Sequence, residues 1–336
     1  MREVSRGSCP GHILGNVRGV QLTWRNGLDS GEVAEVVELL AEAEAADGVA
    51  PAGEQVLLRL NQHRGVSDQI EPVQADVRSE HFLIRDEDGT LVGYAHLDTE
   101  QERDAGLLVA ELAVRPEHRG KGAGTQLVEA LLDRADLPAE PAPDTGRLRI
   151  WAHGEHPAAA RLAEKFGFAR PRELWRMGRE LAGAELPEVE LTGGVRLRTF
   201  RPGQDEPAVV AVNRRAFSWH PEQGGMTEDE LRLKEDQDWF DPAGFFLAEG
   251  SGGELLGFHW TKVHPDGTGE VYVVGVDPDA QGRGLGKSLT VAGLRHLRDI
   301  GCRHAMLYVE ADNAPAVKVY RRLGFDKWDV DVQFGR

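Results

Sequence analysis

The sequence has few cysteines, no long apolar run and a shortage of positive charge. Only 2 of its 336 residues are cysteine. Cys9 and Cys302 cannot form a disulfide framework and have no metal-ligand spacing, which is typical of a protein in a reducing compartment. We therefore expect a cytoplasmic protein. No apolar stretch approaches the roughly 20 residues that a membrane span needs, so a membrane protein is not expected.

The start of the chain also lacks the apolar segment of a secretory signal peptide. Its first 19 residues read MREVSRGSCPGHILGNVRG, and we expect residues 1–19 to form a disordered tail. Acidic residues outnumber basic ones by 56 to 39, which gives a formal net charge of −17. This charge repels phosphate backbones, which disfavours nucleic-acid binding, and it is compatible with a cationic amine as substrate.

The sequence does contain an internal repeat. A chain of 336 residues is long enough for two domains of roughly 150 residues each. VRPEHRGKGAGTQL (114–127) recurs as VDPDAQGRGLGKSL (276–289), and WAHGEHPAAARLAEKFGF (151–168) recurs as YVEADNAPAVKVYRRLGF (308–325). Two matches in the same order predict one whole domain in each half. We expect domains at 20–182 and 195–336, joined by a polar linker at 183–194.

The second copy contains several predicted strands. FFLAE (245–249) and LLGFHWTKV (255–263) are expected to pair as a hairpin around SGGE. EVYVVGV (270–276) is rich in β-branched residues and predicts a third strand. HAMLYVEA (304–311) predicts a further, buried strand.

Two helices are expected between and after these strands. The first begins at about Gly286 and ends before Gly301. The second begins after Asn313, with Pro315 in its first turn, where a missing N–H costs nothing. One face of the first helix is expected to carry Leu289, Gly293, Leu297 and Ile300. Together the elements predict an α/β protein with a mixed sheet, repeated once.

Each glycine-rich stretch follows a predicted strand and precedes a predicted helix. The backbone N–H groups of such a turn surround a concavity at the positive end of a helix dipole, and this arrangement binds phosphate. No GxGxxG pattern occurs in the sequence, and the loop lies late in each repeat. Both facts disfavour a dinucleotide-binding fold.

The loops resemble the acetyl-CoA loop of the GCN5-related N-acetyltransferases (GNAT). The resemblance rests on Gln281-x-x-Gly284-x-Gly286, on Arg119-x-x-Gly122-x-Gly124, and on a following motif of Asn313, Ala316, Tyr320, Gly324 and Phe325. It implies a tandem repeat of two GNAT domains, up to two molecules of acetyl-CoA per chain, and no metal. The implied cofactor-binding residues are Val274, Gly275, Val276, Gln281, Gly282, Arg283, Gly284, Leu285, Gly286, Lys287, Asn313, Ala314, Pro315, Ala316, Val317 and Lys318, and in the first copy Leu112, Ala113, Val114, Arg119, Gly120, Lys121, Gly122, Ala123, Gly124 and Thr125.

Four further segments resemble one tandem branch of this family, whose members acetylate the cysteine amine of a cysteinyl-glucosaminyl-inositol. The segments are DGVAPAGEQVL (47–57), HPEQGG (220–225), GFHWTKVHP (257–265) and GEVYVVGVDP (269–278). GFHWTKVHP is far more specific than a glycine loop. We expect a monomer that takes a small-molecule amine and has no nucleic-acid or membrane partner. The substrate contacts that the resemblance implies are Glu54, Glu222, Lys262, Glu270 and Tyr308.

Amide formation from a thioester needs a base for the amine proton, a donor for the oxyanion and an acid for the departing thiolate. Glu270 begins the strand that leads to the loop, and we predict that it is the base, directly or through a water. Tyr320 lies two helical turns after Asn313, and we predict that its phenol protonates the CoA sulfur. The resemblance implies that the N–H of Val274 or Val276 is the oxyanion donor.

The first copy keeps the loop but not these side chains. Glu111 lies near the position of Glu270, three residues out of register, and on a regular strand it would point to the other face. We expect chemistry only in the second domain, while the first holds acetyl-CoA without turnover or serves as a scaffold. The replaced positions are Leu108 for Glu270, Ala163 for Tyr320 and His156 for Asn313.

Two other interpretations stay open at this point. The loop and Tyr320 specify only the cofactor, so an acetyltransferase for a peptide N-terminus or an aminoglycoside fits the same residues. A protein that senses acetyl-CoA without chemistry also fits, although Glu270 and Tyr320 would then have no purpose. A purely structural protein fits least, because a scaffold has no need for two phosphate-shaped loops.

Overall fold

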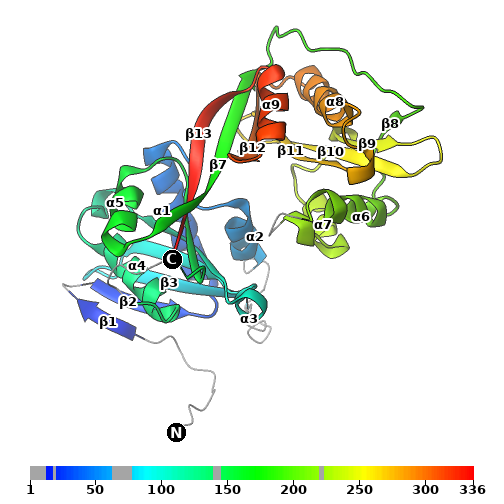
Figure 1. Ribbon diagram of the computed structural model, residues 1–336. Coiled ribbons are helices and arrows are strands. Elements are labelled where there is room, and N and C mark those ends of the chain that lie inside the picture. Colours follow the sequence, from blue (N-terminus) through cyan, green and yellow to red (C-terminus); the bar gives the residue numbers. More distant parts are fainter. Residues whose placement is uncertain (1–12, 18–19, 63–77, 139–144, 219–222) are drawn as a thin grey trace. The chain divides into compact units, whose positions relative to one another are not determined.

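The computed structural model describes residues 13–17, 20–62, 78–138, 145–218 and 223–336 (Figure 1). The chain divides into two compact units. Unit 1 comprises Met1–Leu174 with Val330–Arg336, and unit 2 comprises Trp175–Asp329. Each unit has its own set of adjacent strands and its own apolar cores, as the repeat in the sequence predicts.

Unit 1 is a mixed sheet with helices on both faces. Its strands run in the order β1-β2-β3-β4-β5-β6-β13. The core on one face contains side chains of α1 and α2, and the core on the other contains side chains of α4 and α5. Its elements are β1 (Ile13–Val17), β2 (Val20–Arg25), α1 (Ser30–Asp47), α2 (Glu54–Gln62), β3 (Ser79–Arg85), β4 (Leu91–Asp98), α3 (Glu102–Ala105), β5 (Leu108–Val114), η2 (Pro116–His118), α4 (Ala123–Arg134), β6 (Leu148–Ala152), α5 (Pro157–Phe166) and the start of β7 (Ala169–Glu180).

Unit 2 repeats this plan, with strand order β7-β12-β11-β10-β9-β8. Helices α6 and α7 cover one face of its sheet, and α8 and α9 cover the other (Figure 1). Its elements are β8 (Arg196–Thr199), α6 (Glu206–Ala216), η3 (Gln223–Gly225), α7 (Glu228–Glu235), η4 (Pro242–Gly244), β9 (Phe245–Glu249), β10 (Leu255–Val263), β11 (Gly269–Val276), η5 (Pro278–Ala280), α8 (Leu285–Asp299), β12 (His304–Glu310), α9 (Ala314–Arg322) and the start of β13 (Asp326–Gly335).

The unit boundaries differ from the predicted domains in three ways. The last strand of the chain, β13, pairs with β6, so residues 330–336 belong to unit 1. The end of β7 and the predicted linker 183–194 belong to unit 2, where Arg295 of α8 donates to the carbonyl of Pro187 at 2.8 Å. Residues 13–17 of the expected tail form β1, which pairs with β2. The pairing of β13 with β6 is long-range and leaves no local sequence signal.

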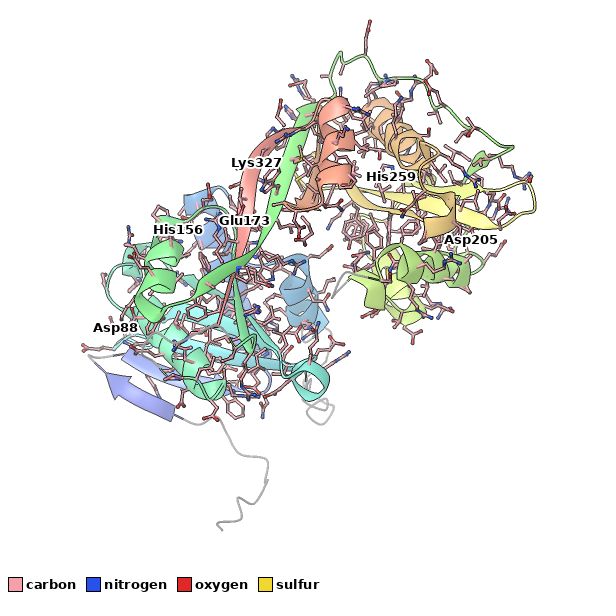
Figure 2. The ribbon with its side chains drawn as sticks, in the orientation of Figure 1. Asp88, His156, Glu173, Asp205, His259 and Lys327 are labelled. Carbon is pink, nitrogen blue, oxygen red and sulfur yellow. The ribbon has the colours of Figure 1, made fainter. Side chains whose placement is uncertain are left out.

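The predicted elements of the second copy are present with small shifts at their ends. Helix α9 begins directly after Asn313, as predicted, and the side chain of Asn313 caps it by accepting from the N–H of Ala316 at 3.2 Å. Gly293 lets α8 approach β10, because a Cβ there would collide with the ring of His259. Figure 2 labels His259 in unit 2. Ile300 was expected on the same face of α8 as Leu289 and Leu297, but it follows the end of that helix and is 52% exposed. The expected buried strand at 304–311 is only partly buried, since Tyr308 is exposed.

Candidate functional site

Both glycine loops lead into helices whose N-termini have no side-chain cap. Gly122 precedes α4 and Gly284 precedes α8, with φ angles of +103° and +79°, a region that glycine adopts without strain. Neither helix start carries a side-chain cap bond, whereas Asn313 caps α9 and His156 caps α5. The first N–H groups of α4 and α8 therefore remain donors for an anion. The predicted loop residues 119–125 and 281–287 lie in the segments that lead into α4 and α8 and in the first helical turns of these helices.

Each loop lies beyond a point where two parallel strands separate. In unit 2, β11 pairs with β12 only at Gly269 and Glu270, although β11 continues to Val276. In unit 1, β5 pairs with β6 from Leu108 to Glu111, and β5 continues to Val114. The strands therefore diverge after Glu270 in one unit and after Glu111 in the other. A glutamate is thus the last paired residue in both units.

The prediction that Glu111 faces away from the position of Glu270 is wrong. The pairing of β10 with β11 shifts between Trp260 and Thr261, where β11 has one residue more than its partner. The pairing of β4 with β5 is regular throughout. A bulge of one residue reverses which face the following side chains occupy, so a comparison without gaps assigns the wrong face.

The faces follow from the cores. In unit 2, Glu270 lies opposite Lys262 and shares a face of the sheet with the paired residues Trp260 and Val273. Trp260 and Val273 belong to the core that α6 helps to form, so Glu270 faces α6. In unit 1, Glu111 shares its face with Ala113 and Tyr94, which pack against α1 and α2. Since α1 and α2 occupy the place of α6 and α7 in the repeat, both glutamates lie on the equivalent face.

Glu270 is buried and bound by a histidine that the sequence analysis did not assign. Its side chain is 7% exposed, and its Oε2 lies 2.7 Å from Nε2 of His264. His264 follows β10 in the turn to β11 and keeps 27% of its side-chain surface exposed. The separate strands predicted at 255–263 and 270–276 were a usable signal, because a short turn between them would bring residue 264 back beside the start of the second strand.

Lys262, a predicted substrate contact, lies against an aromatic pair on this face. Its Nζ is 4.7 Å from the ring centre of Trp239 and 5.3 Å from that of Tyr272. Tyr272 is the extra residue of the bulge, because Val271 and Val273 pair with consecutive residues of β10. Cation–π contacts of this length hold an ammonium group in place.

Tyr320 lies on α9, on the opposite face of the unit 2 sheet. Its ring packs edge-on against Phe325, with centres 5.9 Å apart, and it joins the core that includes Val274. Burial raises the pKa of its phenol to about 12. The hydroxyl is therefore protonated at neutral pH.

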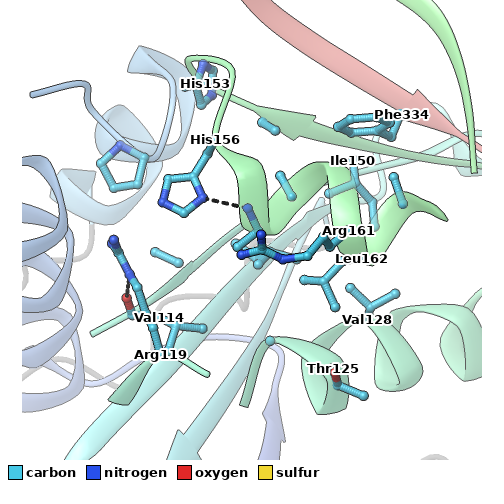
Figure 3. A pocket seen from close by; sticks show the side chains of 18 of the residues that line it. Val114, Arg119, Thr125, Val128, Ile150, His153, His156, Arg161, Leu162 and Phe334 are labelled. Atoms are coloured by element: carbon cyan, nitrogen blue, oxygen red, sulfur yellow. Dashed lines mark hydrogen bonds between the residues drawn. The ribbon is translucent and has the colours of Figure 1, made fainter. Parts of the chain in front are cut away.

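Unit 1 contains a cavity of about 650 Å³ over its loop (Figure 3). Its wall includes Val114, Arg119, Gly122 and Thr125 from the predicted cofactor-binding residues. Ala163, at the position of Tyr320, lines it without a polar group. Arg119 donates to the carbonyl of Val114 at 3.1 Å, as Gln281 does to Val276 in unit 2 at 3.2 Å.

Glu111 belongs to a closed network at the edge of this cavity. Its Oε2 accepts from the N–H of Gly53 and lies 3.0 Å from Nε2 of His153. The other ring nitrogen of His153 lies 3.0 Å from Asp331, whose second oxygen accepts from the N–H of Gly154 at 3.0 Å. Burial alone would lower the pKa of His153, but the hydrogen bonds and charges of the two carboxylates raise it to about 10. The network is therefore a buried cation between two anions.

The remaining predicted substrate contacts are distributed over both units. Glu54 is the first residue of α2 in unit 1, whereas Lys262, Glu270 and Tyr308 lie on β10, β11 and β12 of unit 2. Glu222 lies outside the described residues. Within the described ranges, no cluster of three or more His, Cys, Asp or Glu side chains has the geometry to hold a metal ion. In the same ranges, no helix has both the length and the apolar character to cross a membrane.

Comparisons with known proteins agree with this geometry. The model of the Acetyltransferase (GNAT) family matches residues 55–168 and 212–325, one match in each copy of the repeat. A mycothiol acetyltransferase of Saccharopolyspora erythraea is 71% identical over 302 residues, which are 89% of this chain and 99% of that relative. A protein of the same name from Actinosynnema mirum is 56% identical and covers 93% of this chain, with 98% of its own length matched.

Two solved structures have the same architecture. A GCN5-related N-acetyltransferase from Sphaerobacter thermophilus aligns with a TM-score of 0.65 at 25% identity, over 94% of this chain and 95% of that chain. A tandem GNAT protein from the clavulanic acid biosynthesis pathway aligns with a TM-score of 0.66 over 94% and 98%, and its 17% identity supports the fold alone. The predicted tandem repeat and mixed α/β sheet are confirmed.

Proposed function

This chain belongs to the acetyltransferase (GNAT) family, and on that premise we propose that it acetylates the cysteine amine of cysteinyl-glucosaminyl-inositol, giving mycothiol and CoA. Full-length relatives at 71% and 56% identity carry the name mycothiol acetyltransferase. The observation that carries the proposal is the junction in unit 2, where β11 and β12 separate directly after a buried glutamate. An acceptor amine and a thioester can meet there with a base beside them.

The loop residues would hold acetyl-CoA. Gly284 and the first turn of α8 offer N–H groups without a side-chain cap, which suits a pyrophosphate. Arg283 and Lys287 are exposed at the rim and add positive charge. Acetyl-CoA supplies the activated acetyl group. Unit 1 has the same uncapped glycine start and a cavity, so a second molecule there is part of the proposal.

Glu270 and Tyr320 would handle the protons. Glu270 takes the proton of the acceptor ammonium, directly or through a water, because its carboxylate lies where the strands separate. Tyr320 lies on the face of the sheet that α8 covers, the helix that follows the loop, and it gives its proton to the departing sulfur. The candidate oxyanion donor is the N–H of Val274 or Val276, both of which lie beyond the point where β11 leaves β12.

The acceptor would be recognised by charge and hydroxyl contacts. Lys262 is held beside Glu270 on the same face and suits hydroxyl groups of a sugar or inositol. Tyr308 is exposed on β12 and Glu54 begins α2, and both are proposed substrate contacts, as is Glu222. A monomeric state, a cytoplasmic location and the absence of nucleic-acid and membrane partners belong to the same proposal.

Mass spectrometry of the products tests the acceptor. The protein is given acetyl-CoA with cysteinyl-glucosaminyl-inositol, a peptide N-terminus or an aminoglycoside, and the mass increase of one acetyl group is followed. We expect acetylation of the cysteinyl compound with its thiol still titratable, since the amine is the acceptor. An S-acetyl product, or a preference for either of the other amines, would refute the proposed substrate.

A further inference from the structure

The predicted base Glu270 is bound at one of its two carboxylate oxygens. Nε2 of His264 lies 2.7 Å from Oε2, a short distance typical of a hydrogen bond to a charged group. The carboxylate is 7% exposed, so water does little to orient it. A buried carboxylate with one fixed donor keeps a single orientation, and its other oxygen, Oε1, is then directed by the same bond.

His264 is itself held in place by the turn that carries it. Its backbone N–H donates to the carbonyl of Thr268 at 2.9 Å, and its own carbonyl accepts from the N–H of Gly267 at 2.9 Å. Asp266 closes the turn by accepting from the N–H and the hydroxyl of Thr268 at 2.9 and 3.0 Å. The imidazole is thus presented to Glu270 from a tight, hydrogen-bonded hairpin.

Resting on the proposed acetyl transfer, we propose that His264 is a positioning residue for the reaction. It donates from Nε2 to Oε2 of Glu270 and thereby turns Oε1 toward the acceptor amine at the strand junction. His264 does not touch the reacting atoms in this role. Its effect comes from geometry, since a displacement of about 1 Å at a reacting group can cost on the order of 100-fold in rate.

Two substitutions at position 264 distinguish a histidine that positions Glu270 from one that transfers protons or has no part in the reaction. His264→Ala removes the donor, and we expect kcat to fall about 10- to 100-fold with the KM for acetyl-CoA unchanged. His264→Gln keeps an N–H donor of similar reach and is expected to recover most of the loss. The matched control is His304→Ala, which removes another histidine of unit 2 whose Nε2 lies 3.3 Å from Glu180. This control should leave kcat unchanged.

The proposal is overturned if His264→Ala keeps the kcat of the original protein. It is also overturned if His264→Gln is as slow as His264→Ala and added imidazole restores both, because His264 would then carry protons.

The hydrogen bond has a readout that needs no turnover. In NMR of the whole ¹⁵N-labelled protein, the Nε2 signal of His264 should move in Glu270→Gln and stay in place in Glu254→Gln, an exposed turn residue. An unmoved signal in Glu270→Gln refutes the pair. If the proposed function fails, the original protein makes no acetylated cysteinyl product while this signal still moves, so the two failures are distinguishable.

Discussion

Each unit places a glutamate where the pairing of its two parallel strands ends, but the two units surround it differently. In unit 2, a single imidazole from an exposed turn binds Oε2 of Glu270. In unit 1, Oε2 of Glu111 binds both the N–H of Gly53 and His153, and Asp331 holds the other side of that ring. The arrangement in unit 2 orients the carboxylate of Glu270. The arrangement in unit 1 links β5, β13 and the loop at Gly53 through hydrogen bonds of the carboxylates.

The comparison changes the physical reason for expecting an inactive first unit. The sequence analysis argued that unit 1 lacks the carboxylate, because Leu108 aligns with Glu270. The structure shows that unit 1 has a carboxylate on the equivalent face at the strand junction. What unit 1 lacks is the phenol, since Ala163 stands in place of Tyr320. We infer that the surroundings of the carboxylate, and not its presence, separate the units.

The largest expected effect comes from removing each glutamate in turn. Glu270→Gln should lower kcat about 10²- to 10⁴-fold, because a predicted base is lost, and the loss should grow at low pH where the amine is hardest to deprotonate. Glu111→Gln should keep its turnover and lower the free energy of unfolding by roughly 1–3 kcal/mol, because a buried ionic network is weakened. Steady-state product formation and denaturant unfolding measure the two quantities.

The opposite outcome would reverse the comparison. If folded Glu111→Gln loses turnover while Glu270→Gln retains it, the chemistry lies in unit 1. Glu254→Gln serves as the control for a glutamate removed from an exposed turn.

The loops can be broken separately in the same way. Gly284→Val and Gly122→Val each place a side chain at a position of positive φ and block the approach of a phosphate to the loop amides. Calorimetry should show that each variant loses one acetyl-CoA per chain, and only Gly284→Val should lose turnover. Gly253→Val is the matched control, because Gly253 has a φ of +85° and open space around it but lies in the β9–β10 turn.

One result would contradict the assignment of the loops. If Gly284→Val binds acetyl-CoA with unchanged affinity and stoichiometry, then the turn before α8 is not the cofactor site of unit 2.

Local features of the fold were predictable from the sequence. The strand bounds 245–249 and 255–263 were predicted as the structure has them, since alternating and β-branched residues between turns predict strands directly. The cap of α9 at Asn313 and the glycines before α8 follow from residue type, because only a few residues suit those backbone positions.

Features that depend on distant pairing were not predictable. No residue pattern marks the bulge at Tyr272. When the two repeats are aligned without gaps, the bulge makes every strand residue before it appear on the wrong face of the sheet. Asp331 reaches His153 only because β13 pairs with β6, across a separation of 178 residues in the sequence. Neither arrangement follows from a local pattern, so the closed network of unit 1 could be found only in three dimensions.

A smaller effect is expected from removing the hydroxyl of Tyr320, a group that unit 1 lacks at the equivalent position, Ala163. Tyr320→Phe keeps the ring that packs against Phe325 and removes only the hydroxyl. Because the predicted acid is lost, kcat should fall about 100-fold, at the lower end of the range for such groups, while affinity for acetyl-CoA stays the same. Pre-steady-state release of CoA measures the step, and full activity in this variant would leave unit 2 without an assigned acid.

The smallest expected effect concerns the charge of the closed network in unit 1. The pKa of His153 is raised from 6.5 to about 10, so the folded state holds a proton that the unfolded chain releases above pH 6.5. The stabilisation is fully present below about pH 6.5 and is lost as the pH rises through 10. His153→Gln should therefore unfold at a lower temperature than the original protein at pH 6, and the difference should shrink steadily toward pH 10. His304→Gln, which removes a half-exposed imidazole, should show no such trend. A difference that stays constant from pH 6 to 10 would mean that His153 is not a buried cation, and the contrast between the two glutamates would then rest on hydrogen bonding alone.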